Sequence, residues 1–369
     1  FHIGKKEIIF IGGILGLVAT ATAVFFILQF FPQVDRLNGK NFDEKDPFGN
    51  LRGRIHQTLA LKGDYAADLY FFDIETRQFK LLFNEYRSPD WSSNFGDMYV
   101  GYTSKFSSRG DKFAYAVARL LREDERTRGS TIAFRGQLEI TTFDIKTGKW
   151  LPLSRSSLYN KRLPQWSPDD TKLIFNAVDG NEIRFDPDGF FYNPNAWGVY
   201  LVDAQGNERR LTNGAYPHWS PDGSRVLFMR SDGLYTYSFE SENSERVYSF
   251  SDGNVTFAAK LGLSRDGKLL ALTNPPTHDV KVFDVVSWEP FTISIKKRIF
   301  SGETSFFWPV FSPDSQYLVV QASDWDDASE GKRSNQRLVV YELKNFESKT
   351  IASLADYNFD VAFITDWQY

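Results

Sequence analysis

The stretch PQWSPDDTKLIF, residues 164–175, recurs in near copies along this chain, and the recurrence decides the fold. It returns as PHWSPDGSRVLF at 217–228 and as PVFSPDSQYLVV at 309–320. Two weaker copies place the same serine at Ser107 and Ser264. The five serines stand roughly 60, 53, 44 and 48 residues apart. This spacing is typical of propeller blades that carry inserted loops.

Each copy predicts a tight turn followed by a strand. Proline presets φ at the second turn position, aspartate accepts backbone hydrogen bonds, and glycine tolerates the left-handed exit. Runs such as KLIFNAV (172–178) and RVLFMR (225–230) then predict strands of alternating burial. The aspartates Asp169, Asp222, Asp266 and Asp314 are therefore interpreted as turn formers rather than catalytic or metal-binding residues.

A second type of hairpin lies between the copies and sets the blade count. Six such hairpins are expected, whereas only five inner hairpins carry the serine turn. The sequence leaves one strand at 54–63 and another at 358–369. If the terminal strand becomes the innermost strand of the first blade, six blades of four strands result. This arrangement closes the ring and removes open sheet edges. The prediction is an all-β, six-bladed propeller closed by its C-terminal strand.

The repeat resembles a known family. The pattern WSPDG, then a strand, then YLVD and RRLT at 200–212, is similar to the WD40-like (PD40) repeat of TolB-type β-propellers over roughly residues 52–369. The resemblance implies the propeller fold and says almost nothing of function. The chain departs from TolB because it carries a predicted anchor and no sequence for the α/β domain ahead of TolB's propeller. TolB's partners are therefore not carried over.

The N-terminal region predicts a membrane anchor. Residues 8–31 are 24 residues without a charge, and a helix of that length spans about 36 Å. The run extends past the A-x-A sites of ATATA, which favours an uncleaved anchor over a signal peptide. The expected organisation is a flank at 1–7, a transmembrane helix at 8–31, a linker at 32–51 and the propeller at 52–369.

Small residues on the anchor predict a helix partner. Gly12, Gly16 and Thr20 form a stripe that lets membrane helices approach closely, although glycine is also common in such helices for other reasons. Lys5 and Lys6 precede the span, and this placement favours an extracytoplasmic propeller, on the periplasmic side if the source is bacterial.

Composition narrows the chemistry. The net charge of −4 gives no electrostatic reason to expect nucleic acid, and the absence of cysteine excludes disulfides and thiolate metal sites. The sequence has no G-x-S-x-G elbow, no P-loop and no H-E-x-x-H motif. No enzyme activity, cofactor or metal site is expected, and no catalytic residue is assigned.

Two groups of residues are candidates for binding. The first lies in insertions at 179–198 and 323–336, where exposed aromatic residues would dock a partner: Phe190, Phe191, Tyr192, Trp197 and Trp325. The alternative is that these rings pack back onto their blades. The second is a polar patch on the inner strands, at Lys105, Gln165 and His218, facing the channel. It would bind a small anion or a peptide terminus, unless these are simply satisfied polar residues.

These observations favour a non-enzymatic, membrane-anchored propeller that serves as an accessory subunit, scaffold or docking platform of a membrane protein complex. Its expected partners are integral-membrane subunits, contacted through the transmembrane helix and the propeller loops. The alternatives are an extracytoplasmic propeller that senses a small ligand or peptide and, third, a propeller enzyme such as a lyase or hydrolase.

Overall fold

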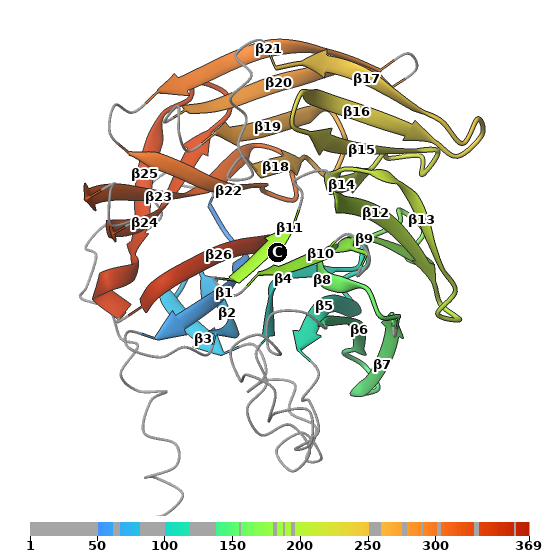
Figure 1. The fold of residues 1–369 in the computed structure, drawn as a ribbon. Helices are drawn as coiled ribbons and strands as arrows, with labels where there is room; N and C mark the ends of the chain where they lie inside the picture. Colours follow the sequence, from blue (N-terminus) through green and yellow to red (C-terminus); the bar gives the residue numbers. More distant parts are fainter. Residues whose placement is uncertain are drawn as a thin grey trace, which may run out of the picture.

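The structure is a computed structural model, and it is a six-bladed β-propeller around a central channel (Figure 1). The residues it describes are 51–61, 67–81, 100–118, 138–154, 156–179, 183–186, 189–192, 196–250, 260–274, 279–288, 291–300, 304–327, 332–357 and 359–368. The predicted flank, transmembrane helix and most of the linker lie outside these residues. Among the described residues, no helix has the length and apolar character needed to cross a membrane.

Each blade is a four-stranded antiparallel sheet, and we name the blades A to F around the ring. From the channel outward, the strands of the first three blades are as follows. Blade A has β26 (Phe359–Gln368), β1 (Arg54–Leu61), β2 (Ala67–Asp73) and β3 (Gln78–Leu81); blade B has β4 (Val100–Phe106), β5 (Lys112–Ala118), β6 (Leu138–Asp144) and β7 (Lys149–Ser154); blade C has β8 (Tyr159–Trp166), β9 (Lys172–Val178), β12 (Trp197–Asp203) and β13 (Glu208–Asn213).

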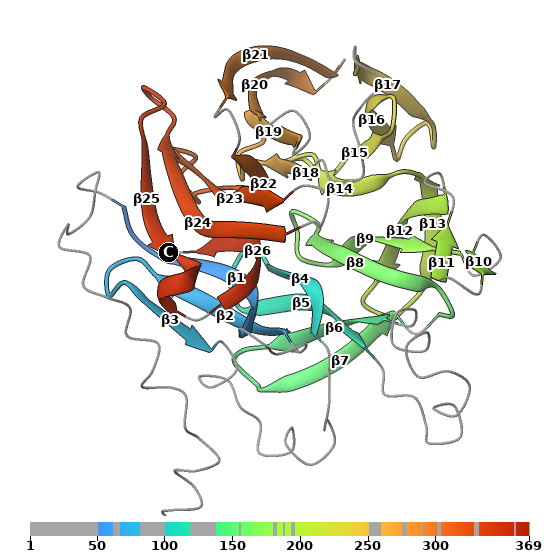
Figure 2. The same cartoon turned by 60° about the vertical axis from the view of Figure 1, so that its left-hand side comes forward.

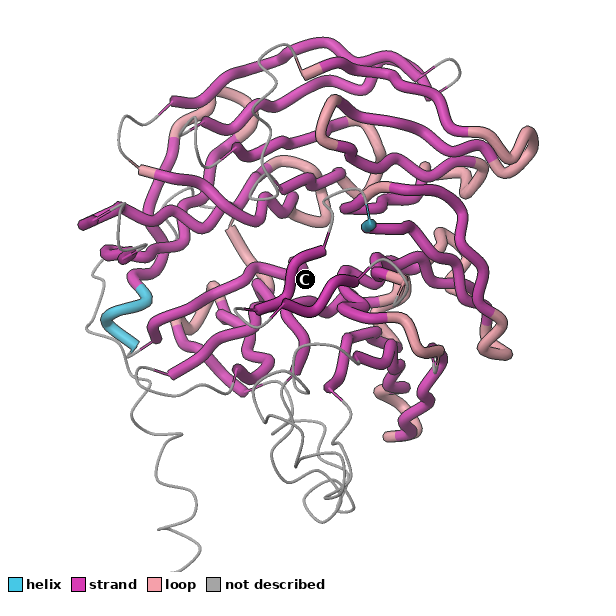
Figure 3. Tube along the Cα trace, viewed as in Figure 1, coloured by secondary structure: helices cyan, strands magenta, loops and turns pink. Residues whose placement is uncertain are grey.

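The other three blades follow the same plan without strand exchange. Blade D has β14 (Ala215–Trp219), β15 (Arg225–Arg230), β16 (Gly233–Ser238) and β17 (Ser244–Ser249); blade E has β18 (Lys260–Leu263), β19 (Leu269–Asn274), β20 (Asp279–Trp288) and β21 (Phe291–Phe300); blade F has β22 (Ser305–Phe311), β23 (Tyr317–Asp327), β24 (Lys332–Glu342) and β25 (Ser348–Ser353). A small hairpin of β10 (Ile183–Asp186) and β11 (Gly189–Tyr192) lies between β9 and β12 in the chain. Figure 3 shows how little of the described chain is helical, the exception being the 3-10 turn η5 (Leu354–Tyr357).

The predicted ring closure is confirmed. β26 pairs antiparallel with β1, from Arg54 opposite Gln368 to Leu61 opposite Phe359, and Figure 2 shows the two strands side by side. The innermost strands contact one another in the order β26, β4, β8, β14, β18, β22 and back to β26. Every inner strand therefore has a neighbour on both sides, and blades B and E lie on opposite sides of the channel.

The hydrogen bonds of the serine turn explain why the same residue types recur in each copy of the repeat. In all five copies the serine N–H donates to the carbonyl five residues later, at 2.9 Å. In the Ser220 copy, the hydroxyl donates to Asp222 Oδ1 at 2.6 Å and accepts from the Arg225 N–H at 2.9 Å. These hydrogen bonds confirm the aspartates as turn formers. The Ser220 hydroxyl is also the main reason why the pKa of Asp222 lies below its ordinary value.

The strands that follow the turns are not alternating, and this corrects the sequence-based expectation. After Lys172, the next six residues of β9 are all buried. The reason is that each blade is covered on both faces by its neighbours, so both sides of its second strand face apolar cores. Phe175, for example, packs with Ala114 and Ala116 of blade B, whereas Ile174 packs with Val226 and Phe228 of blade D.

Candidate functional site: the central channel

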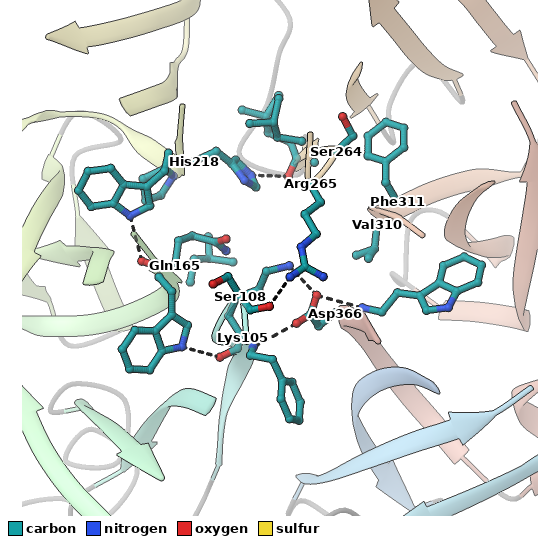
Figure 4. A pocket seen from close by; sticks show the side chains of 18 of the residues that line it. Lys105, Ser108, Gln165, His218, Ser264, Arg265, Val310, Phe311 and Asp366 are labelled. Atoms are coloured by element: carbon teal, nitrogen blue, oxygen red, sulfur yellow. Dashed lines mark hydrogen bonds and ion pairs between the residues drawn. The ribbon is translucent and has the colours of Figure 1, made fainter. Parts of the chain in front are cut away.

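A cavity of about 350 Å³ occupies the channel, and all six blades contribute to it. Its lining comes from equivalent positions around the serine turns, which gives it three tiers. Each tier is defined by its position relative to the serine of the turn. Residues two positions before the serine form the middle tier, and residues four positions before it form the inner tier. Residues directly after the serine form the mouth. Figure 4 shows the middle tier and the mouth from close by.

The middle tier holds all three residues of the predicted polar patch. Lys105, Gln165 and His218 line the same cavity, from blades B, C and D. Gly262, Val310 and Asp366 stand at this position in blades E, F and A. Sequence reasoning missed Asp366, although the segment Asp366-Trp367-Gln368 matches Gln165-Trp166-Ser167 position by position. Whether the patch binds a ligand stays a prediction.

Asp366 and Lys105 form an ion pair inside the channel. Lys105 Nζ lies 2.6 Å from Asp366 Oδ1, and the Asp366 side chain is only 5 % exposed. The other oxygen, Oδ2, accepts the Phe106 N–H at 3.1 Å and the Gln368 amide at 3.0 Å. The carboxylate is therefore saturated by groups of its own chain, and the pair fastens the C-terminal strand to blade B.

The remaining middle-tier residues are uncharged. His218 Nε2 hydrogen-bonds the Leu261 carbonyl at 3.1 Å, and burial lowers the pKa of His218 to about 4. The imidazole is therefore neutral at pH 7. The side-chain amide of Gln165 makes no hydrogen bond within the described part of the chain, so its donor and acceptor are available in the cavity.

Tryptophans lock the middle tier in place from one blade to the next. Trp166 Nε1 donates to the Lys105 carbonyl at 3.1 Å, and Trp219 Nε1 donates to the Gln165 carbonyl at 3.2 Å. Trp367, the equivalent residue of blade A, donates instead to the Arg52 carbonyl at 3.1 Å. The first two bonds tie neighbouring blades together, whereas the third ties β26 to the chain just before β1 of its own blade.

The inner tier is apolar and partly strained. Leu163, Tyr216, Trp308 and Ile364 line this part of the cavity. Three of them occupy the left-handed region, with φ of 54° at Leu163, 56° at Tyr216 and 52° at Trp308. A bulky residue in that region costs roughly 1–2 kcal/mol, and such strain clusters at functional sites. The same distortion in three blades, always at the channel, was not readable from the repeat.

The mouth carries two residues that depart from the repeat. Proline follows the serine in blades C, D and F, whereas Ser108 takes this place in blade B and Arg265 takes it in blade E. The Arg265 guanidinium reaches across the channel and donates from Nη2 to the carbonyl of Ser108, on the opposite blade B (Figure 4). The Ser108 N–H and hydroxyl both donate to the buried Asp170 carboxylate, at 2.7 Å each.

The aromatic docking candidates are resolved in part. Trp197 is not an exposed anchor: it begins β12, is only 6 % exposed, and packs with Val178 and Ala196. For this residue the alternative, packing back onto the blade, is correct. Phe190, Phe191 and Tyr192 lie in β11, and Trp325 lies in β23 opposite Arg333. The segment 323–336, expected as an insertion, is mostly strand, because β23 and β24 extend through it.

No group of three or more histidine and acidic side chains suited to a metal ion occurs among the described residues.

Comparison with known proteins identifies solved structures of similar fold. TolB from Acinetobacter baumannii aligns with a TM-score of 0.53 and 18 % identity, over 85 % of this chain and 66 % of that one. An oligogalacturonate lyase in complex with manganese gives 0.50 and 14 %, over 78 % and 71 %. A nidogen/laminin complex gives 0.51 and 9 %, over 84 % and 97 %. The likeness is one of fold alone. No protein-family model and no curated protein sequence matches the chain.

Proposed function

We propose that this chain is a non-enzymatic docking propeller that receives part of a partner protein in the mouth of its channel. The observation that supports this most strongly is the cavity itself. It gathers side chains from all six blades, it keeps the Gln165 amide open for hydrogen bonding, and it concentrates strained backbone at its inner tier. Ligand sites are concave and combine apolar surface with a few convergent polar groups; this cavity has both, with a lining that is about half polar.

The proposal includes the predicted anchor and an accessory role in a membrane complex. The first described residues lie at the mouth, because the Arg52 carbonyl accepts a hydrogen bond from Trp367. A linker of 20 residues, 32–51, reaches at most about 65 Å when fully extended. An anchor at 8–31 would therefore hold the mouth within that distance of the membrane, where an integral-membrane subunit could reach it.

Antiparallel topology separates the two kinds of connection within a blade. The second strand of a blade joins the third through a connection of its own, as β9 joins β12 and β23 joins β24. The serine turns join the first strand to the second, so the two kinds of connection begin on opposite faces. The proposed platform thus offers a channel mouth on one face and loop connections on the other.

The test is site-specific photocrosslinking in the full-length chain. A photoreactive residue replaces Gln165 in the channel, or Val286, which is 67 % exposed on β20 and serves as the control position. Cells are irradiated, extracted in a mild detergent, and the products are identified by mass spectrometry. We expect a stoichiometric integral-membrane partner captured from position 165 and not from position 286. A lone 42.4 kDa species, or equal capture from both positions, would contradict the proposal.

A further inference from the structure

In the middle tier and at the mouth of the channel, two cations are paired with carboxylates and one arginine is not. Lys105 is neutralised by Asp366 at 2.6 Å, and Arg109 is paired with Asp170 at 3.2 Å. Arg265 has no carboxylate partner within the described residues; its guanidinium donates only to the Ser108 carbonyl. Arg265 is therefore a cation at the mouth that no carboxylate of the described chain engages, although the whole chain carries a net charge of −4.

Guanidinium at this place is suited to binding a carboxylate. Its planar fork presents five N–H donors, matches the two oxygens of a carboxylate, and is more weakly hydrated than an ammonium group. The Arg265 side chain is exposed, and a carbonyl partner leaves most of its donors unused. An incoming carboxylate would replace a neutral acceptor with a charged one, and charge-assisted hydrogen bonds are the stronger kind.

The inner end of the cavity is suited to an apolar ligand group rather than to a carboxylate. Leu163, Trp308 and Ile364 present apolar surface there, and Tyr216 completes the tier. Lys260 stands at the inner-tier position of blade E but does not line the cavity; it donates to the Tyr216 hydroxyl at 2.6 Å and lies 4.9 Å from the centres of the Tyr216 and Trp308 rings. It holds the two aromatic residues in position and adds no negative charge. An apolar side chain fits this end.

The middle tier decides between a peptide and an alkyl chain. The inner tier and the mouth are five residues apart along each inner strand, or about 16 Å in a fully extended strand. A ligand that spans this length passes the Gln165 amide and the other polar groups of the middle tier. An alkyl chain would leave the Gln165 amide without a partner, at a cost, whereas an extended peptide offers it N–H and C=O groups.

We propose that the channel binds an extended polypeptide segment with an apolar residue in the inner tier and a single carboxylate on Arg265. The two ligand residues are about three positions, or about 10 Å, apart, because their side chains and that of Arg265, which extends into the channel, cover the rest of the distance. This inference rests on the proposed docking function and names the chemistry of the docked segment. Arg265 is the residue that selects for negative charge, and the inner tier selects for the apolar side chain.

The experiment uses defined peptides and the full-length chain. The acidic probe is Ac-Phe-Gly-Gly-Asp-NH2, and its neutral counterpart carries Asn in place of Asp. A third probe, Ac-Ala-Gly-Gly-Asp-NH2, shortens the apolar end. Binding is followed by intrinsic fluorescence, because Trp166, Trp219 and Trp308 line the cavity, and is checked by calorimetry. We expect the acidic Phe probe to bind at least about tenfold more tightly than either of the others.

Variants assign the charge preference to one residue. Arg265→Gln should remove the preference for Asp over Asn and leave the neutral probe unaffected, whereas Arg265→Lys should keep part of the preference. The matched control is Arg246→Gln, since Arg246 is an exposed arginine on β17, away from the cavity. Equal binding of Asp and Asn probes, no binding of any probe, or the same loss in both glutamine variants would overturn the proposal.

Two further outcomes separate this inference from the docking function. Decanoate, a single-charge alkyl carboxylate, should bind more weakly than the acidic peptide; tighter binding would overturn the peptide assignment. If a partner is still captured from position 165 in the Arg265→Gln variant with undiminished yield, the docking function stands and the charge assignment fails.

Discussion

Removing β26 should unfold most of the propeller, because this strand closes the ring. The change is a truncation after Tyr357. It deletes Trp367, which is 3 % exposed, and Ile364, which is 2 % exposed. Burial of a large apolar side chain is worth about 1.5–3 kcal/mol, so these two account for roughly 3–6 kcal/mol. A whole domain is stable by only about 5–15 kcal/mol.

The truncation also removes contacts other than those of Trp367 and Ile364. Ile55 of β1 is fully buried and would lose its cover, and the Phe106 N–H and Lys105 would lose the Asp366 carboxylate. A buried donor left without a partner costs about 1–3 kcal/mol more. Together these losses reach the total stability of an ordinary domain. We therefore expect no cooperative unfolding transition in the truncated chain at 25 °C.

The assay is urea unfolding followed by circular dichroism. Trp367→Ala is the graded comparison: it should keep a cooperative transition and lose about 3–5 kcal/mol of unfolding free energy. A synthetic peptide of residues 358–369, added to the truncated chain, should restore the transition by supplying the missing strand. The reasoning is refuted if the truncated chain unfolds at the same urea midpoint as the full chain.

Three other predictions concern single residues near the channel. Asp170→Gly should lower the unfolding free energy by about 2–4 kcal/mol in urea, because the Asp170 carboxylate accepts hydrogen bonds from Ser108 and Arg109; an unchanged midpoint would contradict this. Gly262→Ala should cost about 1–3 kcal/mol, since an added Cβ would lie 2.2 Å from the Pro309 carbonyl oxygen; wild-type stability would show that the blades separate freely. Burial lowers the pKa of His56 from 6.5 to about 4. Between pH 6.5 and pH 4 the folded state therefore binds fewer protons than the unfolded state. The free energy of unfolding should fall by about 3 kcal/mol as the pH drops from 6.5 to 4. The partly exposed His218 should add a smaller loss of the same sign, and unfolding curves of His56→Gln at pH 7 and pH 4.5 should show a flatter dependence than wild type.

The fold was predictable because its signals are local and repeated. A serine turn uses only residues within five positions of the serine, so each copy specifies its own geometry. Ring closure was predictable by counting strands, and the pairing of β1 with β26 confirms it. The burial pattern of β9 was not, because it depends on two neighbouring blades that contact its faces.

The site was predictable only where it follows the repeat. Lys105, Gln165 and His218 share one position before the serine, and that position lines the channel. Asp366 occupies the same position in a strand that lacks the serine turn, and Arg265 occupies the proline position of the blade E turn. Both departures are visible once the copies are aligned. The left-handed residues of the inner tier are not, because Leu, Tyr and Trp carry no local preference for positive φ.

The pairing of the first strand with the last also determines when the ring can close during protein synthesis. Arg52 and Trp367, which are hydrogen-bonded, stand 315 residues apart. At about 5–20 residues per second, β1 waits roughly 15–60 s for its neighbour to be translated. Throughout that interval blades B to F can form while β1 still offers an unpaired edge to any other nascent strand. The edge of β1 is therefore the part of the sheet that is open to mispairing for the longest time during synthesis.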